Sequence, residues 1–185
     1  MATDFQIRHA ASVIQQGGII SCPTDTIYGL SCDPYNPQAI ERLFAIKRRP
    51  RGKSMILLAH ARRHVETLID MQQLPDGFDW CTQQPTTWVM PASRHCPHWL
   101  RRRDNTLAVR LTTYPLIIRL CGQLDSAIIS TSANFAGMPP VCDKLALRRF
   151  FQPQLDAMLF SDINGTGKPS TIKHFRDNTV IRQSS

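Results

Sequence analysis

The chain has 185 residues, of which 42% are hydrophobic, so it can bury the core of one compact domain spanning residues 1–185. Lysine and arginine number 22 against 14 acidic residues, and the formal charge of +8 favours polyanionic partners such as nucleotides or RNA. No apolar run is long enough to span a bilayer and the N-terminus does not resemble a secretory signal, which predicts a cytoplasmic protein without membrane contact.

The first expected helix begins at Asp4, which can serve as its N-cap. Gly17-Gly18 is expected to end this helix, because glycine readily leaves helical geometry. The apolar residues between them repeat at helical spacing and predict one face packed on a sheet: Ile7, Ala10, Ala11 and Ile14.

A turn rich in hydroxyl groups follows a short strand expected at residues 19–22. Pro23 closes the strand, and the turn runs from Thr24 to Leu30. Its hydroxyl-bearing residues are Thr24, Thr26 and Tyr28. Taken alone, this segment favours an ordinary turn with Gly29 at a special backbone angle over a ligand site.

A dense basic cluster lies at the end of the second expected helix. This helix starts at Asn36-Pro37, and Lys47 falls on the same stripe as Leu43. The cluster is Lys47-Arg48-Arg49-Pro50-Arg51-Gly52-Lys53, which places five cations within seven residues before a strand expected at 55–58. This density exceeds what helix capping requires, so the cluster is interpreted as an anion site.

The middle of the chain predicts a helix, a strand and a long loop. The helix is expected at 61–70, with Val65, Leu68 and Ile69 facing inward. Residues 86–90 are β-branched and aromatic and predict a strand. Residues 94–104 predict a loop.

That loop carries two features that polyanions or metals could use. The run Arg101 to Arg103 lies near Trp99 and could contact RNA, although a solvated loop is the favoured interpretation. His95-Cys96-Pro97-His98 gathers metal-ligand types but has no second ligand cluster nearby. The six cysteines form no Cys-x-x-Cys pair, so neither a zinc knuckle nor a redox dithiol is indicated.

The remaining elements complete an alternation of strands and helices. Strands are expected at 107–111, 127–130 and 157–160, and helices at 116–121 and from an Asp143 cap to Phe151. Arg110 lies within an apolar strand and needs a partner, either a bound anion or a structural carboxylate. The alternation predicts a single-domain α/β fold with a twisted open sheet, mixed or mostly parallel, and flanking helices.

The stretch from Ile128 to Pro140 is the strongest candidate for a site. Its apolar start changes abruptly into Ser130, Thr131, Ser132 and Asn134, before a glycine and two prolines. Polar residues at a strand end are a common ligand position in open α/β sheets. Helix caps and turns use the same residues, so this stretch alone leaves both interpretations open.

A phosphate loop is not indicated. Residues 165–170 imitate its tail, but the first glycine position holds Asp162 and Pro169 removes an amide where the helix should begin. Any nucleotide must therefore be held chiefly by side chains. No Ser-His-Asp arrangement and no metal-hydrolase signature is legible in the sequence.

Taken together, five segments resemble the YrdC family, in the same order and over nearly the whole chain. In length the chain resembles the short bacterial form, which lacks an added C-terminal domain. The segments are Pro23–Leu30, Lys47–Pro50 with Lys53, Leu107–Arg110, Ser130–Asn134 and Lys168–Ile172.

The resemblance implies a deep basic cavity and a specific nucleotidyltransferase reaction. L-Threonine, bicarbonate or CO2, and ATP would give threonylcarbamoyl-adenylate and pyrophosphate. The product would serve threonylcarbamoylation of the adenosine next to the anticodon of tRNA, completed by downstream threonylcarbamoyl-transferase proteins.

The resemblance also implies roles for individual residues. The family's Lys-x-Arg and Ser-x-Asn elements match Lys47, Arg49, Ser132 and Asn134, which are the expected catalytic and ATP-binding residues. Lys53, Ser130 and Ser170 are further expected ATP contacts. The expected threonine contacts are Thr24, Thr26, Tyr28 and Arg110. Mg2+ would bind mainly through the nucleotide, without a dedicated protein metal site.

One segment departs from the family pattern. The usual Pro-Gly-Pro turn is replaced by Thr82-Gln83-Gln84-Pro85-Thr86-Thr87, which loses the glycine and one proline. A paralogue that carbamoylates and adenylates another acceptor therefore stays open. So does a non-catalytic protein that binds double-stranded RNA or tRNA through its basic surface.

Overall fold

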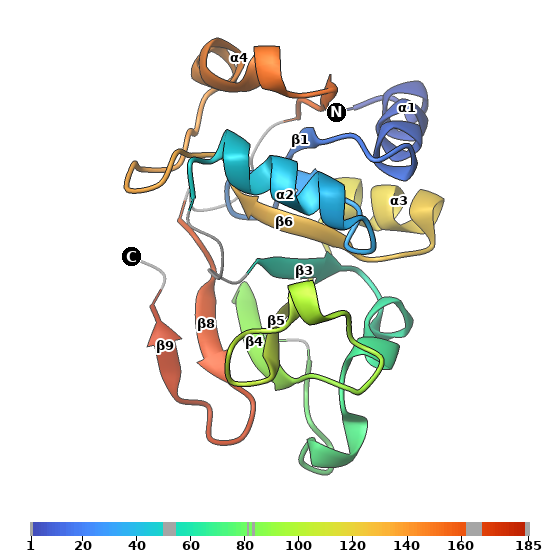
Figure 1. Ribbon diagram of the computed structural model, residues 1–185, viewed down its shortest axis with the longest axis vertical. Coiled ribbons are helices and arrows are strands. Elements are labelled where there is room, and N and C mark those ends of the chain that lie inside the picture. Colours follow the sequence, from blue (N-terminus) through green and yellow to red (C-terminus); the bar gives the residue numbers. More distant parts are fainter. Residues whose placement is uncertain (1, 50–54, 81, 83, 162–167, 184–185) are drawn as a thin grey trace.

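The computed structural model describes residues 2–49, 55–80, 82, 84–161 and 168–183. Within them, nine strands form one open sheet in the order β7-β1-β2-β6-β3-β5-β4-β8-β9 (Figure 1). The strands are β1 (Ile20–Pro23), β2 (Tyr28–Cys32), β3 (Ile56–Ala59), β4 (Thr86–Pro91), β5 (Thr106–Leu111), β6 (Ile128–Ser132), β7 (Ala157–Met158), β8 (Thr171–His174) and β9 (Val180–Arg182). The pairs β1–β7, β3–β5 and β4–β8 are parallel and the other neighbours antiparallel, so the expected α/β fold with a mixed sheet is confirmed.

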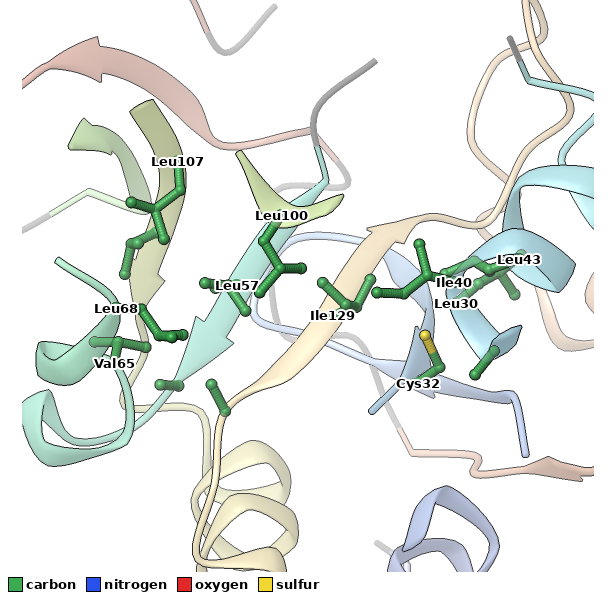
Figure 2. Close-up of a cluster of buried hydrophobic side chains, with 14 of the residues drawn as sticks. Leu30, Cys32, Ile40, Leu43, Leu57, Val65, Leu68, Leu100, Leu107 and Ile129 are labelled. Atoms are coloured by element: carbon green, nitrogen blue, oxygen red, sulfur yellow. The ribbon is translucent and has the colours of Figure 1, made fainter. Parts of the chain in front are cut away.

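Four α-helices cover the sheet in the described part of the chain: α1 (Asp4–Gln15), α2 (Pro37–Ile46), α3 (Pro115–Leu124) and α4 (Lys144–Phe151). Side chains alternate between the faces of a strand, so neighbouring residues enter different cores. Leu57 and Ile129 belong to the cluster that includes Ile40 of α2, which Figure 2 shows. Leu58 and Ile128 belong to the cluster with α1 and α3. None of the described helices has the length and apolarity that a bilayer-crossing segment needs.

The cap of α1 is Thr3, and the expectation for Asp4 is wrong. The Gln6 backbone N–H donates to Thr3 Oγ1 at 3.2 Å, and the Thr3 N–H donates to Gln6 Oε1 at 2.9 Å. This reciprocal capping box satisfies two backbone donors at once, which a cap one residue later would forgo. Asp4 is instead free to pair with Arg119 of α3.

We expect Thr3→Ala to lower the free energy of unfolding by about 1 kcal/mol, because it removes the hydroxyl that caps α1. For a chain of this size that loss corresponds to roughly 2–4 °C in Tm. Thermal unfolding monitored by circular dichroism measures the shift. Thr3→Ser keeps the hydroxyl and should unfold at nearly the wild-type temperature; equal losses in both variants would argue against the cap.

The helix expected at residues 61–70 is not formed. The segment contains short 3-10 turns, η1 (Arg62–His64) and η2 (Glu66–Leu68), and a third, η3 (Met71–Gln73), follows. Val65 leaves helical geometry, with φ −133°. The Ser93 N–H donates to the Leu68 carbonyl and the Asp70 N–H to the Pro91 carbonyl, so backbone groups that a helix would use bind the end of β4 and the residues after it. The inward residues Val65, Leu68 and Ile69 are nevertheless buried, as expected.

Three strands of the structure were not predicted from the sequence: β2, β8 and β9. β2 occupies residues that were expected to belong to the turn, which itself ends at Ile27. β8 and β9 were not expected at all, because β8 is only half-buried and β9 is exposed. Strands without a buried face show no clear apolar alternation. These strands nevertheless bring the C-terminal part of the chain to the site described next.

Candidate functional site

A polar cavity of about 170 Å³ lies on the α1 and α3 face of the sheet, at the ends of its central strands. Leu58 lies at the border between the hydrophobic core and the cavity, because it both packs with α1 and α3 and lines the cavity. On β6 the change from apolar to polar side chains is clearest, because Ile128 of the same packed cluster is followed on that face by Ser130 and Ser132, which line the cavity. The wall is formed by Thr24, Thr26, Ile27, Gly29, Arg49, Met55, Ile56, Leu58, Ala108, Arg110, Ser130, Thr131, Ser132, Pro169, Ser170, Ile172 and Arg182.

Three arginines from distant parts of the chain share this cavity: Arg49, Arg110 and Arg182. Burial, followed by the charge of Arg110, lowers the pKa of Arg182 below its ordinary value. Burial and then the charge of Arg182 lower the pKa of Arg49 in the same way. Cations that repel one another in a partly desolvated space form a favourable site for an anion.

Arg110 has the structural carboxylate that the sequence left as one of two possibilities. Its Nη2 forms an ion pair with Asp25, and its Nη1 donates to Thr26 Oγ1 at 3.3 Å. Thr26 Oγ1 is also 3.0 Å from Thr24 Oγ1, which donates to the Ile27 carbonyl at 2.7 Å. The hydroxyl turn therefore supports the arginine from one side and faces the cavity from the other.

The end of α2 directs two basic residues to different places. Arg48 adopts a left-handed conformation with φ +49°, the Arg48 N–H donates to the Ala45 carbonyl and the Arg49 N–H to the Phe44 carbonyl. These bonds form a Schellman motif, which ends the helix abruptly. A left-handed arginine costs about 1 kcal/mol or more, since its Cβ crowds the backbone. The bend leaves Lys47 facing the core while Arg49 turns to the cavity.

Lys47 holds the polar end of β6 from behind. Its Nζ donates to the Ser132 carbonyl, to the Asn134 carbonyl at 2.9 Å and to Asn134 Oδ1 at 3.0 Å. The residue is only 2% exposed, and burial followed by the charge of Arg49 lowers the pKa of Lys47 to about 7. An ammonium has three donors, so all of them are used within the protein. Lys47 therefore positions this turn rather than lining the cavity.

The two residues of the Ser-x-Asn element also differ in position, since Ser132 lies on the cavity wall and Asn134 lies behind it. Ser132 lines the cavity, and its Oγ donates to Asn134 Oδ1 at 2.6 Å. Asn134 Nδ2 donates to the Met138 carbonyl at 2.6 Å, which fixes the loop after β6. Hydrogen bonds thus join Lys47, Ser132 and Asn134 in one network, while Arg49 bonds to the neighbouring Thr131. Arg49 and Ser132 lie on the cavity wall, and Lys47 and Asn134 lie behind it.

Gly29 lets β2 pass close to Ser130. The two strands pair with Gly29 opposite Ser132, and a Cβ built on Gly29 would lie 2.8 Å from Ser130 Oγ. Such an approach is closer than real Cβ contacts, so the serine hydroxyl would have to rotate away. A glycine at this position keeps the Ser130 hydroxyl available on the cavity wall.

For the nucleotidyltransferase reaction that the sequence resemblance implies, we expect Gly29→Ala to lower kcat/KM by roughly tenfold, about 1.4 kcal/mol of transition-state stabilisation. Displacement of the Ser130 hydroxyl is the physical cause. Gly122→Ala is a matched control, because a Cβ there meets nothing within 4 Å and the helix interior prefers alanine. Steady-state rates of both variants test the prediction, and equal activity of the two alanine variants would contradict it.

The opposite wall comes from the C-terminal strands. Ser170 lines the cavity, its Oγ lies 2.8 Å from Thr87 Oγ1, and its carbonyl accepts from Arg182 Nη2 at 2.9 Å. Of the altered turn, Thr82 Oγ1 donates to the Gln84 carbonyl at 2.6 Å, and Gln83 lies outside the described residues. Gln84 and Pro85 are not among the wall residues, but the Pro85 carbonyl accepts from the Thr171 N–H at 3.2 Å and Thr87 contacts Ser170, so this turn supports the strand that carries the wall.

One other expected residue among those described is not on the wall. Tyr28 is buried in the core, where its hydroxyl donates to the Ser161 carbonyl at 3.2 Å, because strand alternation sends its neighbours Ile27 and Gly29 to the cavity instead. Lys53 lies outside the described residues.

Sequence reasoning assigned no individual role to three polar residues at this site. Asp25 pairs with Arg110, Thr131 accepts from Arg49 Nη1 at 3.3 Å, and Arg182 lies on the wall. The neighbours of Asp25 and Thr131 were candidates, so proximity in sequence was an available signal. For Arg182 no local signal existed.

The Arg101 to Arg103 loop is partly structural. Arg101 donates to the Cys96 carbonyl at 2.8 Å, the Arg94 carbonyl at 3.0 Å and Asn105 Oδ1 at 3.2 Å. Trp99 Nε1 donates to the Pro34 carbonyl at 3.0 Å. These bonds brace the loop. No three His, Cys, Asp or Glu side chains gather as a metal site in the described part of the chain, His95 and His98 included.

A protein-family model described as Sua5_yciO_yrdC, telomere recombination, matches residues 12–184. The chain belongs to this family. A threonylcarbamoyl-AMP synthase of Coxiella burnetii (strain RSA 493 / Nine Mile phase I) is 38% identical over 180 residues, covering 95% of this chain and 96% of the relative. Another, of Stutzerimonas stutzeri (strain A1501), is 36% identical over 186 residues, covering 98% and 99%.

Solved structures of Sua5–YciO–YrdC members share the fold. E. coli YciO superposes with a TM-score of 0.87 at 22% identity, covering 100% of this chain and 91% of that one. P. abyssi Sua5 complexed with L-threonine gives a TM-score of 0.87 at 24% identity, covering 98% of this chain and 55% of that one. At these identities the likeness concerns the fold alone.

Proposed function

We propose that this chain is a threonylcarbamoyl-AMP synthase, which converts L-threonine, bicarbonate or CO2, and ATP into threonylcarbamoyl-adenylate and pyrophosphate. Relatives that carry this name are 36–38% identical and match nearly the full length of the chain. The single observation that carries the proposal is the composition of the cavity, whose wall brings together three arginines and several hydroxyl groups.

ATP would bind with its phosphates among the cations and hydroxyls of this cavity. Arg49 is the family-matched cation on the wall, and Arg182 adds a second. Cations aimed at a leaving pyrophosphate stabilise the charge that develops in the transition state. Ser130, Ser132 and Ser170 provide hydroxyls for the nucleotide, and Lys53 is proposed to join them. Lys47 and Asn134 act indirectly, by fixing the Ser132 turn.

Threonine would bind beside the hydroxyl turn. Arg110 offers a planar fork that matches a carboxylate, and Thr24 and Thr26 line the same part of the wall. P. abyssi Sua5 was solved with L-threonine on a similar fold, which supports a threonine site in this family. Tyr28 would contribute by supporting the turn from the core side.

Mg2+ would bind at this site as a companion of the nucleotide. No cluster of three His, Cys, Asp or Glu ligands exists in the described residues, and the wall offers mainly hydroxyl oxygens. Mg2+ commonly binds through substrate phosphates with few protein ligands. When bound, it would neutralise phosphate charge, while Ser130 and Ser132 hold the phosphate oxygens beside it.

The reaction needs no protein nucleophile. The threonine amine would attack CO2, which dehydration of bicarbonate supplies, and would lose a proton to water to give the carbamate. A carbamate oxygen would then attack the α-phosphorus of ATP as pyrophosphate leaves. Holding the reactants together supplies most of the rate enhancement, because an encounter in solution becomes an intramolecular step. The adenylate would then pass to transferase proteins that modify the adenosine beside the tRNA anticodon.

The proposal is tested by incubating the purified protein with ATP, Mg2+, bicarbonate and each amino acid in turn, and measuring pyrophosphate. We expect release that requires both bicarbonate and threonine. Release with a different amino acid would indicate a paralogue for another acceptor. If the protein binds tRNA in a filter-binding assay but releases no pyrophosphate with any amino acid, a non-catalytic RNA-binding protein would be favoured.

A further inference from the structure

We propose that Asp25 is a positioning residue, which orients Arg110 for the α-carboxylate of the amino acid substrate. The inference rests on the proposed function, in which Arg110 receives threonine. It assigns a specific task to a residue that does not line the cavity itself. Asp25 acts through its ion pair with Arg110.

The geometry of Arg110 shows what has to be positioned. The residue is 5% exposed and lies in the interior of β5. Asp25 pairs with its Nη2 and Thr26 Oγ1 accepts from its Nη1, so the outer end of the guanidinium is held on two sides. Its buried Nε has no hydrogen-bond acceptor among the described residues. Nη1 carries a second N–H that Thr26 does not use, and Arg110 lines the cavity, so this donor can receive an incoming carboxylate.

Asp25 is itself held in a rigid turn. Thr24 Oγ1 accepts from the backbone N–H groups of Thr26 and Ile27 at 3.2 Å each, the two N–H groups that follow Asp25 in the chain. Thr24 Oγ1 also donates to the Ile27 carbonyl at 2.7 Å. The backbone that carries the Asp25 carboxylate therefore has little freedom, and so has the guanidinium that the carboxylate pairs with.

The charges around Arg110 explain why a carboxylate is needed. Arg182 lies close enough that the charge of Arg110 contributes to its lowered pKa, so the two cations repel each other. Without a counter-ion, the Arg110 guanidinium would move away from Arg182 and from the cavity wall. The Asp25 carboxylate offsets this repulsion in the absence of substrate, which keeps the fork in place before threonine arrives.

A purely structural role for Asp25 makes a different prediction. If Asp25 only neutralised a buried charge, its loss would weaken the fold and affect both substrates alike. If it orients Arg110, its loss should raise KM for threonine specifically, and the effect should vanish once Arg110 is altered, because residues that act as a unit are not additive.

The experiment compares Asp25→Asn with wild-type protein in the pyrophosphate assay. We expect KM for threonine to rise about tenfold or more, with KM for ATP changed by less than about twofold. In an Arg110→Lys background, the same change should have no further effect. Asp76→Asn, in an exposed loop, is the matched control and should behave as wild type.

An unchanged or lower KM for threonine, an equal rise for ATP, or additive effects with Arg110→Lys would overturn the inference. If Asp25→Asn does not fold, Asp25→Glu keeps the charge but displaces it by one methylene, and should still raise KM for threonine. An unchanged KM in that variant would equally overturn it. Failure of the proposed function is seen separately, as wild-type protein without threonine-dependent pyrophosphate release.

Discussion

Lys47→Met will reduce the rate of pyrophosphate formation by roughly 10²–10³-fold and will also destabilise the protein. Methionine keeps the length of the side chain but removes the donor that serves the Ser132 carbonyl, the Asn134 carbonyl and Asn134 Oδ1. Losing the preorganised Ser132 turn should cost about as much as losing a donor in an oxyanion hole. The Ser132 carbonyl still accepts from the Asn134 N–H, and Asn134 Oδ1 still accepts from Ser132 Oγ, but the Asn134 carbonyl loses its bond to Lys47. A buried oxygen left without a partner costs about 1–3 kcal/mol, so unfolding by urea should begin at a lower concentration.

The control for this variant is Lys144→Met, at an exposed position on α4, which should retain activity. Lys47→Arg should not restore the rate. The three acceptor oxygens surround the single Nζ of Lys47, whose residue is only 2% exposed, and the donors of a planar guanidinium are spread over three nitrogens and cannot reach all three oxygens there. Full activity in Lys47→Met would show that the network behind β6 is dispensable.

Arg49→Gln will lower turnover by roughly 10²–10³-fold while leaving stability nearly unchanged, since a charge-stabilising donor is lost without a buried group being stranded. In the described part of the chain its guanidinium donates to Thr131 Oγ1 at 3.3 Å, a long bond, and removing Arg49 also relieves its repulsion with Arg182. Rates measured at varied ATP concentrations test the loss of turnover, and unfolding in urea tests the unchanged stability. Arg8→Gln, on the exposed side of α1, is the control.

The contrast between the two variants is diagnostic. Loss of activity together with stability at Lys47, but of activity alone at Arg49, would follow from one residue being behind the wall and the other on it. Similar unfolding behaviour in both would contradict that division.

Local signals in the sequence predicted much of this arrangement. Asn36 and Asp143 cap α2 and α4 as expected, and the stripe shared by Leu43 and Lys47 correctly placed the lysine on the inward face. The change from apolar to polar residues along β6 identified a wall of the cavity. These features depend on nearby residues, which is why a sequence pattern can report them.

Features set by distant contacts could not be read in this way. Arg182 reaches the cavity only because β9 pairs with β8, and exposed strands carry no apolar alternation. The helix expected at 61–70 does not form, because its backbone groups make hydrogen bonds with residues near Pro91 instead. The division of labour between Lys47 and Arg49 depends on the left-handed Arg48, an uncommon conformation for arginine.

The most direct test of the central claim is mass spectrometry of the product formed from ATP, threonine and isotopically labelled bicarbonate. The synthase account predicts threonylcarbamoyl-adenylate that carries the labelled carbon, in amounts equal to the pyrophosphate released, and its loss in Arg49→Gln. Pyrophosphate released without a labelled adenylate, or a labelled adenylate formed equally well by Arg49→Gln, would contradict the assignment of this cavity as the synthase site.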